Sequence, residues 1–182
     1  MNHSVSSSML RKIVRTALIA AVYVALCLVL APLSYGPVQV RVSEALTLLP
    51  ILCPEAVLGV TLGCFIANMF GGMPIDLVVG TLATLLAALA TRKLRNVRRW
   101  RGRPVIASLP PVLINAVFVG TELNFLFPPA TPFAFWWLLP ILSVGLGQLV
   151  SCCILGLMLL WLIEKNPALL RLFSDSATTA KQ

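Results

Sequence analysis

The chain has 182 residues, of which 59% are hydrophobic and only 11% are charged, against roughly a quarter in an ordinary soluble domain. Its mean hydropathy of +0.95 excludes a disordered chain and argues against a soluble enzyme, which could not cover so much apolar surface. Apolar stretches long enough to span a bilayer recur along the sequence, which indicates a polytopic membrane protein.

The net charge of +8 is concentrated beside the apolar stretches, which argues against a nucleic-acid-binding surface. Seven of the 14 basic residues lie in one loop, residues 92–103, and three more lie within residues 11–15, before the first apolar run. Basic segments next to apolar spans mark the cytoplasmic side of a membrane protein. The N-terminus, the 92–103 loop and the C-terminal segment 165–171 are therefore expected to be cytoplasmic.

The first predicted helix runs from about Ile13 to Ala31. It is expected to be a retained span and not a cleaved signal peptide, because Pro32 would hinder cleavage after Ala31. The next apolar segment, residues 44–53, is too short to cross hydrocarbon alone. It must be embedded among other helices, or its flanks must lie beside a cavity.

Four longer helices follow in the sequence, separated by prolines, glycines and the basic loop. They are expected over residues 54–70, 74–91, 105–122 and 134–163, with a mobile polar tail after Pro167. Two spans follow the basic loop, which returns the C-terminal segment to the cytoplasm. Because the N-terminus and the basic loop are both expected to be cytoplasmic, the number of spans between them must be even. The short segment must therefore count as a crossing, which gives four spans before the loop.

The predicted fold is therefore an all-α polytopic membrane protein with six transmembrane helices and both termini in the cytoplasm. The chain is expected to comprise a polar N-terminus (residues 1–12), a single six-helix transmembrane domain that binds substrate (13–163) and a cytoplasmic tail (164–182). This organisation leaves no room for a soluble catalytic domain.

No cofactor or metal site is expected. The five cysteines lie in or beside apolar runs, in an odd number and without a CxxC or Cys/His pattern, which favours buried free thiols. The sequence also lacks a P-loop and the HExxH, GxSxG and dinucleotide motifs. The chain is therefore predicted not to be an enzyme. As a transporter it would need an ion gradient, oligomerisation or a separate ATPase.

Polar residues gather where this topology places the outer half of the membrane. They comprise three carboxylates, two amides, a deeper amide and one arginine: Glu44, Asp76, Glu122, Asn68, Asn115, Gln148 and Arg41. A central ionisable group costs about 2.5–3.5 kcal/mol on insertion scales, so such groups tend to face cavities. The set predicts an outward-open pocket for a ligand that offers hydrogen-bond donors or positive charge.

Each of these residues also has a structural interpretation. Glu44 could pair with Arg41, three residues earlier, and the amides could hydrogen bond between helices. Asp76, like Glu55 on the inner side, lies in a first helical turn, where the helix dipole favours a carboxylate. Glu122 is different, because it lies near a predicted helix C-terminus, where the dipole disfavours it. A positive or donor-rich partner, such as a ligand, is therefore expected there.

Two faces of small residues are expected to allow close helix packing. Ala17, Ala21 and Ala25 recur every four residues in the first helix, and Gly59, Gly63 and Ala67 do so in the third. Ordinary internal packing is the simpler explanation of the second set.

Four segments of the chain resemble the QueT family. They are residues 31–47 (APLSYGPVQVRVSEALT), 65–72 (FIANMFGG), 76–86 and 110–116 (PPVLINA). The resemblance covers about residues 12–163 and is most specific at RVSEAL, residues 41–46. Members of this family are substrate-binding S components of energy-coupling factor (ECF) transporters, assigned to the salvage of queuosine precursors.

This resemblance implies a six-helix S-component bundle in the cell membrane, with its site near the outer surface. The stripe of Ala17, Ala21 and Ala25 resembles the helix-1 alanine motif, which docks on a transmembrane T component, and two ABC-type ATPases would supply the energy. The implied ligand is queuine or a related 7-deazaguanine. Carboxylates such as Glu44 or Glu122 suit the donors of its guanine edge and its amine.

Three other classes compete with this interpretation. A small ion-coupled secondary transporter would use a carboxylate as a proton relay and would need no ATPase partner. A non-transporting assembly subunit would not be expected to hold an occupied outer pocket. A membrane enzyme is disfavoured, because no nucleophile–base set is visible.

Overall fold

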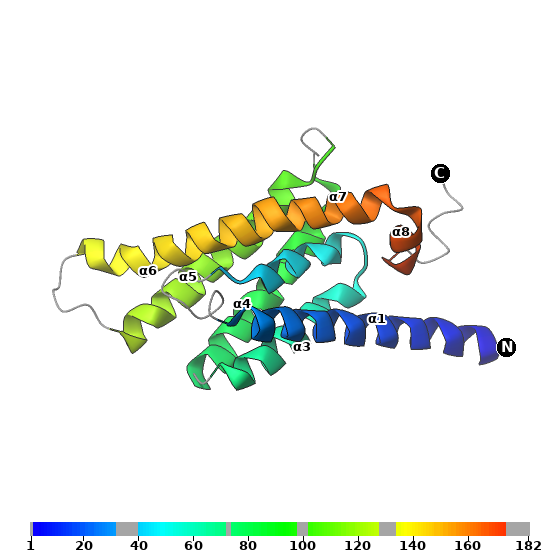
Figure 1. Ribbon diagram of the computed structural model, residues 1–182, viewed down its shortest axis with the longest axis horizontal. Helices are drawn as coiled ribbons and strands as arrows, with labels where there is room; N and C mark the ends of the chain where they lie inside the picture. Colours follow the sequence, from blue (N-terminus) through cyan, green and yellow to red (C-terminus); the bar gives the residue numbers. More distant parts are fainter. Residues whose placement is uncertain (1, 32–39, 72–73, 98–101, 128–133, 174–182) are drawn as a thin grey trace.

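The chain folds into a bundle of helices, with no strand in the part that the structure describes (Figure 1). A computed structural model describes residues 2–31, 40–71, 74–97, 102–127 and 134–173. The longer helices are α1 (Asn2–Val29), α3 (Glu55–Phe70), α4 (Pro74–Lys93), α5 (Leu109–Leu126) and α6 (Ala134–Gln148). The shorter ones are η1 (Val42–Ile51), η2 (Leu94–Asn96), η3 (Val105–Ser108), η4 (Leu149–Gly156), α7 (Leu157–Lys165) and α8 (Pro167–Phe173).

Four helical stretches among the described residues are long and apolar enough to cross a membrane: Ser8–Val29, Pro74–Asn96, Val105–Leu126 and Trp136–Lys165. Two further apolar helices are shorter, Val42–Ile51 and Glu55–Phe70. Leucines, valines and phenylalanines cover much of the outward surface, which water would not tolerate but lipid does. The chain is therefore a multi-pass membrane protein.

The last predicted helix is one continuous rod in Figure 1, formed by α6, η4 and α7. Its middle part, η4, is a π-helix, a wide turn that is rare in proteins and common near functional sites. Beyond it, the segment expected to be a mobile polar tail is helical as far as Phe173, so that prediction is wrong for α8. Asn166 explains the start of α8, since its side-chain oxygen accepts a hydrogen bond from the Ala168 N–H at 3.0 Å. Residues 174–182 lie outside the described part.

The short second segment is embedded among other helices, as its length requires. η1 is a 3₁₀ helix of 10 residues, and every residue in it except Val42 is buried. It contacts α1, α3, α4, η4 and α7. Because a 3₁₀ helix rises about 2.0 Å per residue, against about 1.5 Å in an α-helix, the segment reaches further than its residue count implies.

The two ends of the bundle differ in charge. At one end, called here the basic end, Arg15 contacts Glu55 at 3.7 Å and Arg92 donates to the Pro50 carbonyl at 2.8 Å. At the other, called here the acidic end, α3 and α5 finish and α4 begins, and Asp76 and Glu122 lie there.

The two small-residue faces have different surroundings. A Cβ added at Gly63 would lie 2.6 Å from the Tyr23 Cβ, so the pair Gly59 and Gly63 packs α3 against α1, and the prediction of internal packing is confirmed. Ala17, Ala21 and Ala25 are exposed on α1. The alanine stripe therefore remains available for contact outside the chain.

The glycine contact predicts a selective loss of stability. Gly63→Ala would place a methyl group inside Tyr23 and is expected to destabilise the fold by about 1–3 kcal/mol through overpacking. Gly145→Ala is the matched control, because its Cβ would meet only the Ala116 Cβ, at an ordinary 3.4 Å. Apparent thermal midpoints in detergent, measured for both variants, check this; equal midpoints would contradict the close packing.

Candidate ligand-binding site

Six of the seven residues expected to bind ligand come together at the acidic end, from α3, α4, α5 and the start of η1 with Arg41 just before it, and Gln148 lies at the end of α6. Six of the seven candidates are buried and one is half-buried: Arg41, Glu44, Asn68, Asn115, Glu122 and Gln148, with Asp76 half-buried. Polar groups buried in a membrane protein need partners or a cavity. The contacts of the six at the acidic end divide them into three groups.

The first group joins the start of α4 to the end of α3 through Arg41. The Arg41 guanidinium donates to Asp76 Oδ2 at 2.6 Å and to Asn68 Oδ1 at 3.2 Å. The Asn68 side-chain N–H in turn donates to the Asp76 carbonyl at 2.8 Å. Asp76 therefore has an ion-pair partner in addition to the favourable helix dipole, and this group is held together by the protein itself.

The second group surrounds Glu44, which is only 1% exposed. Its Oε1 accepts hydrogen bonds from the Tyr23 hydroxyl and, at 3.4 Å, from the Thr84 hydroxyl. Its Oε2 accepts one from the Asn115 amide at 3.2 Å. These donors come from α1, α4 and α5, so Glu44 connects η1 to three other helices. Both of its oxygens are occupied by protein donors.

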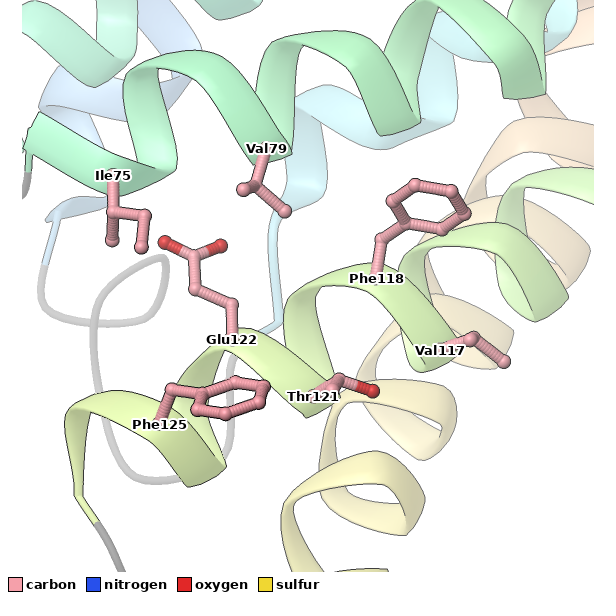
Figure 2. Close-up of a pocket in the computed structure, with 7 residues that line it drawn as sticks. All are labelled: Ile75, Val79, Val117, Phe118, Thr121, Glu122 and Phe125. Carbon is pink, nitrogen blue, oxygen red and sulfur yellow. The ribbon is translucent and has the colours of Figure 1, made fainter.

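Glu122 forms the third group, on the wall of a cavity of about 320 Å³ between α4 and α5 that is open on its outer side, where Phe118 and Phe125 are exposed. Figure 2 shows its carboxylate directed toward α4, between Ile75 and Val79. The side chain is 5% exposed, and within the described part of the chain neither carboxylate oxygen has a hydrogen-bond partner. The remaining lining residues are mostly apolar: Val117, Phe118, Thr121 and Phe125.

Gln148 lies away from this cavity, at the end of α6. It is 3% exposed, and its side-chain oxygen accepts a contact from the Cys152 thiol at 3.3 Å. Of the seven candidates, Glu122 alone is in the lining of the cavity as the described residues define it. The structure therefore brings most of the candidates to one end of the bundle, and their contacts distinguish them from one another.

Several residues that contact the candidates or line the cavity were not predicted from the sequence. Tyr23 carried a usable signal, because a tyrosine in the middle of an apolar span needs a partner for its hydroxyl. Thr84 and the cavity walls carried none, since threonine and aliphatic residues are ordinary in membrane helices. Asn124 was also overlooked; its amide donates to the Gly120 and Trp137 carbonyls at 3.2 and 2.8 Å and joins α5 to α6.

Metal-binding groups are not brought together in the described part of the chain, where no set of three His, Cys, Asp or Glu residues could hold an ion. All five cysteines are free, and four of them are buried. Three of the buried thiols contact polar side chains: Cys27 contacts Ser43, Cys64 contacts Thr84, and Cys152 contacts Gln148. They fill space within the polar network.

A bundle of apolar helices with buried carboxylates at one end defines a multi-pass membrane protein with an intramembrane polar site. The sequence profile of the QueT transporter family matches residues 13–165. The chain belongs to this family, whose members are transporters and not enzymes.

A curated relative agrees with this assignment. The chain is 33% identical over 146 residues to the queuosine precursor transporter QueT of Lactococcus lactis subsp. cremoris (strain MG1363), a match that covers 76% of this chain and 84% of the relative. No solved structure matches the chain.

The Glu44 contacts predict a stability defect without a change of charge. Tyr23→Phe removes one donor from a buried carboxylate and is expected to cost about 1.5–3 kcal/mol, the range for hydrogen bonds to charged groups. A double-mutant cycle with Glu44→Gln isolates the pair, since the Tyr23 change should cost much less when the carboxylate is already gone. Additive losses in thermal or denaturant unfolding would contradict a direct coupling.

Proposed function

We propose that the chain is the substrate-binding S component of an ECF-type importer, which captures queuosine precursors from outside the cell. The observation that carries this is the match to a queuosine precursor transporter over 84% of that protein's length. The chemistry agrees with it, because a 7-deazaguanine offers an N1–H and an exocyclic amine as donors, and buried carboxylates are acceptors. No ATP-binding motif is present in the sequence, which agrees with a chain that depends on partner ATPases for its energy.

The ligand pocket is assigned to the acidic end, with Arg41, Glu44, Asn68, Asp76, Asn115 and Glu122 as its polar residues and with Gln148 deeper in the bundle. The cavity beside Glu122, at about 320 Å³, falls at the lower end of the range for small-molecule sites. Arg41, Asn68 and Glu44 are tied to other protein groups and shape the site. Glu122 has capacity left for a ligand.

The charge asymmetry of the bundle supports a six-span topology with both termini in the cytoplasm. The four long helices, together with η1 and α3, supply the six crossings. Basic residues cluster at the end that carries Arg15 and Arg92, which the positive-inside rule assigns to the cytoplasm of the cell. Residues 13–163 then form the transmembrane domain, residues 1–12 precede it and residues 164–182 follow it. The acidic end faces outward.

The exposed alanine stripe is assigned to docking on a transmembrane T component, which couples the chain to two ABC-type ATPases. Ala17, Ala21 and Ala25 lie on the surface of α1, with Leu18 and Val22 exposed beside them. Small side chains allow the backbones of two membrane helices to approach closely, and α3 does not use these three. An exposed stripe of small residues therefore suits the close packing of a helix from a partner protein.

Ligand capture is tested by equilibrium binding of queuine to the purified full chain in detergent, with guanine as a competitor. Tight binding that guanine does not displace is expected without any partner protein. Failure of folded protein to bind any 7-deazaguanine would refute the assigned substrate and would favour an ion-coupled transporter for another solute.

The docking surface is tested by changing side-chain volume at one position. Ala21→Trp is expected to abolish cellular uptake of queuine while leaving queuine binding by the purified chain unchanged, because the bulky ring blocks close helix approach. Ala21→Ser keeps the side chain small and should retain uptake. Full uptake by the Trp variant would favour a transporter that works without a partner.

A further inference from the structure

Glu122 differs from the other two carboxylates of the acidic end in what surrounds it. Glu44 accepts hydrogen bonds from three side chains, and Asp76 forms an ion pair with Arg41 at 2.6 Å. Neither oxygen of Glu122 receives a hydrogen bond from the described residues. We infer that Glu122 is the residue that binds a protonated amine of the ligand, and that it thereby makes this protein selective for positively charged 7-deazaguanines. This inference rests on the proposed function.

The sequence leaves the acidic end short of positive charge. Arg41 is the single basic residue between Thr16 and Thr91, and none occurs between Pro104 and Glu164. Three carboxylates therefore share this end with one guanidinium, which already contacts Asp76 and Asn68. A ligand that brings its own cation improves this balance, whereas an anionic ligand worsens it.

The cavity makes an unpaired charge costly. Glu122 is 5% exposed, and the side chains that line the cavity with it are apolar except for Thr121. A carboxylate in such surroundings stays ionised only when an opposite charge or strong donors accompany it. An ammonium group satisfies both needs, since it carries the charge and donates hydrogen bonds directly.

The apolar walls of the same cavity can pack against the flat ring of a ligand whose amine contacts Glu122. Phe118, Glu122 and Phe125 follow one another at spacings of four and three residues, so they lie on one face of α5. Figure 2 shows the Phe118 and Phe125 rings on either side of Glu122 along that helix, with Ile75 and Val79 opposite on α4. An aromatic heterocycle with an aminomethyl arm matches apolar walls that surround a single carboxylate.

The wild-type chain tests this with two ligands of similar size and different charge. Calorimetric binding to the full chain in detergent is measured for 7-aminomethyl-7-deazaguanine, whose amine is protonated, and for neutral 7-cyano-7-deazaguanine. The amine is expected to bind roughly 10- to 100-fold more tightly, the range for a hydrogen bond to a charged group. Equal affinities would overturn the inference and leave the proposed function standing. Binding of neither compound would overturn both.

The role of Glu122 itself is tested with Glu122→Gln, which keeps shape and removes charge. Its affinity for the amine should fall roughly 10- to 100-fold while its affinity for the nitrile changes less than about threefold. Glu122→Asp keeps the charge and should retain part of the preference, which guards against a Gln variant that does not fold. Glu55→Gln is the matched control, because Glu55 contacts Arg15 at the basic end. An equal loss for both ligands in Glu122→Gln would assign Glu122 to the ring and contradict the inference.

Discussion

The arrangement of the acidic end depends on the hydrogen bonds that the Glu44 carboxylate accepts. A buried anion in a membrane protein is tolerated only when the protein supplies donors, and here they come from Tyr23, Thr84 and Asn115. Each donor lies on a different helix, so the need to satisfy one carboxylate fixes how α1, α4 and α5 meet η1. Positioning a charge at the first turn of a short helix thus organises a much larger assembly.

The shape of η1 follows from the same constraint. With no water in the hydrocarbon, a 10-residue segment cannot span the bilayer alone and must be surrounded by protein. Gly156 allows this, since a Cβ there would lie 2.7 Å from the Leu48 Cδ1, and it belongs to the π-helical part of the last span. The wide turn and the glycine together let the long helix pack directly on η1.

The three carboxylates at the acidic end therefore differ in their partners. Glu44 is held by neutral donors, Asp76 is held by a guanidinium, and Glu122 is left with capacity toward a cavity. A carboxylate with neither oxygen hydrogen-bonded has more to gain from a ligand than one that protein donors already hold, because a group that is already satisfied gains little. Buried charge near a transport site is thus informative only when its partners are known.

The sequence by itself determined the class of protein, the long spans and the family, because hydropathy, charge patterning and the RVSEAL segment are local properties of the chain. It also distinguished Glu122 from the other carboxylates, since the helix dipole disfavours a carboxylate near a helix C-terminus. It gave no way to separate Glu44 from Glu122 as a ligand acceptor. The donors to Glu44 lie 21, 40 and 71 residues away in the chain, and only the tertiary structure brings them within hydrogen-bonding distance.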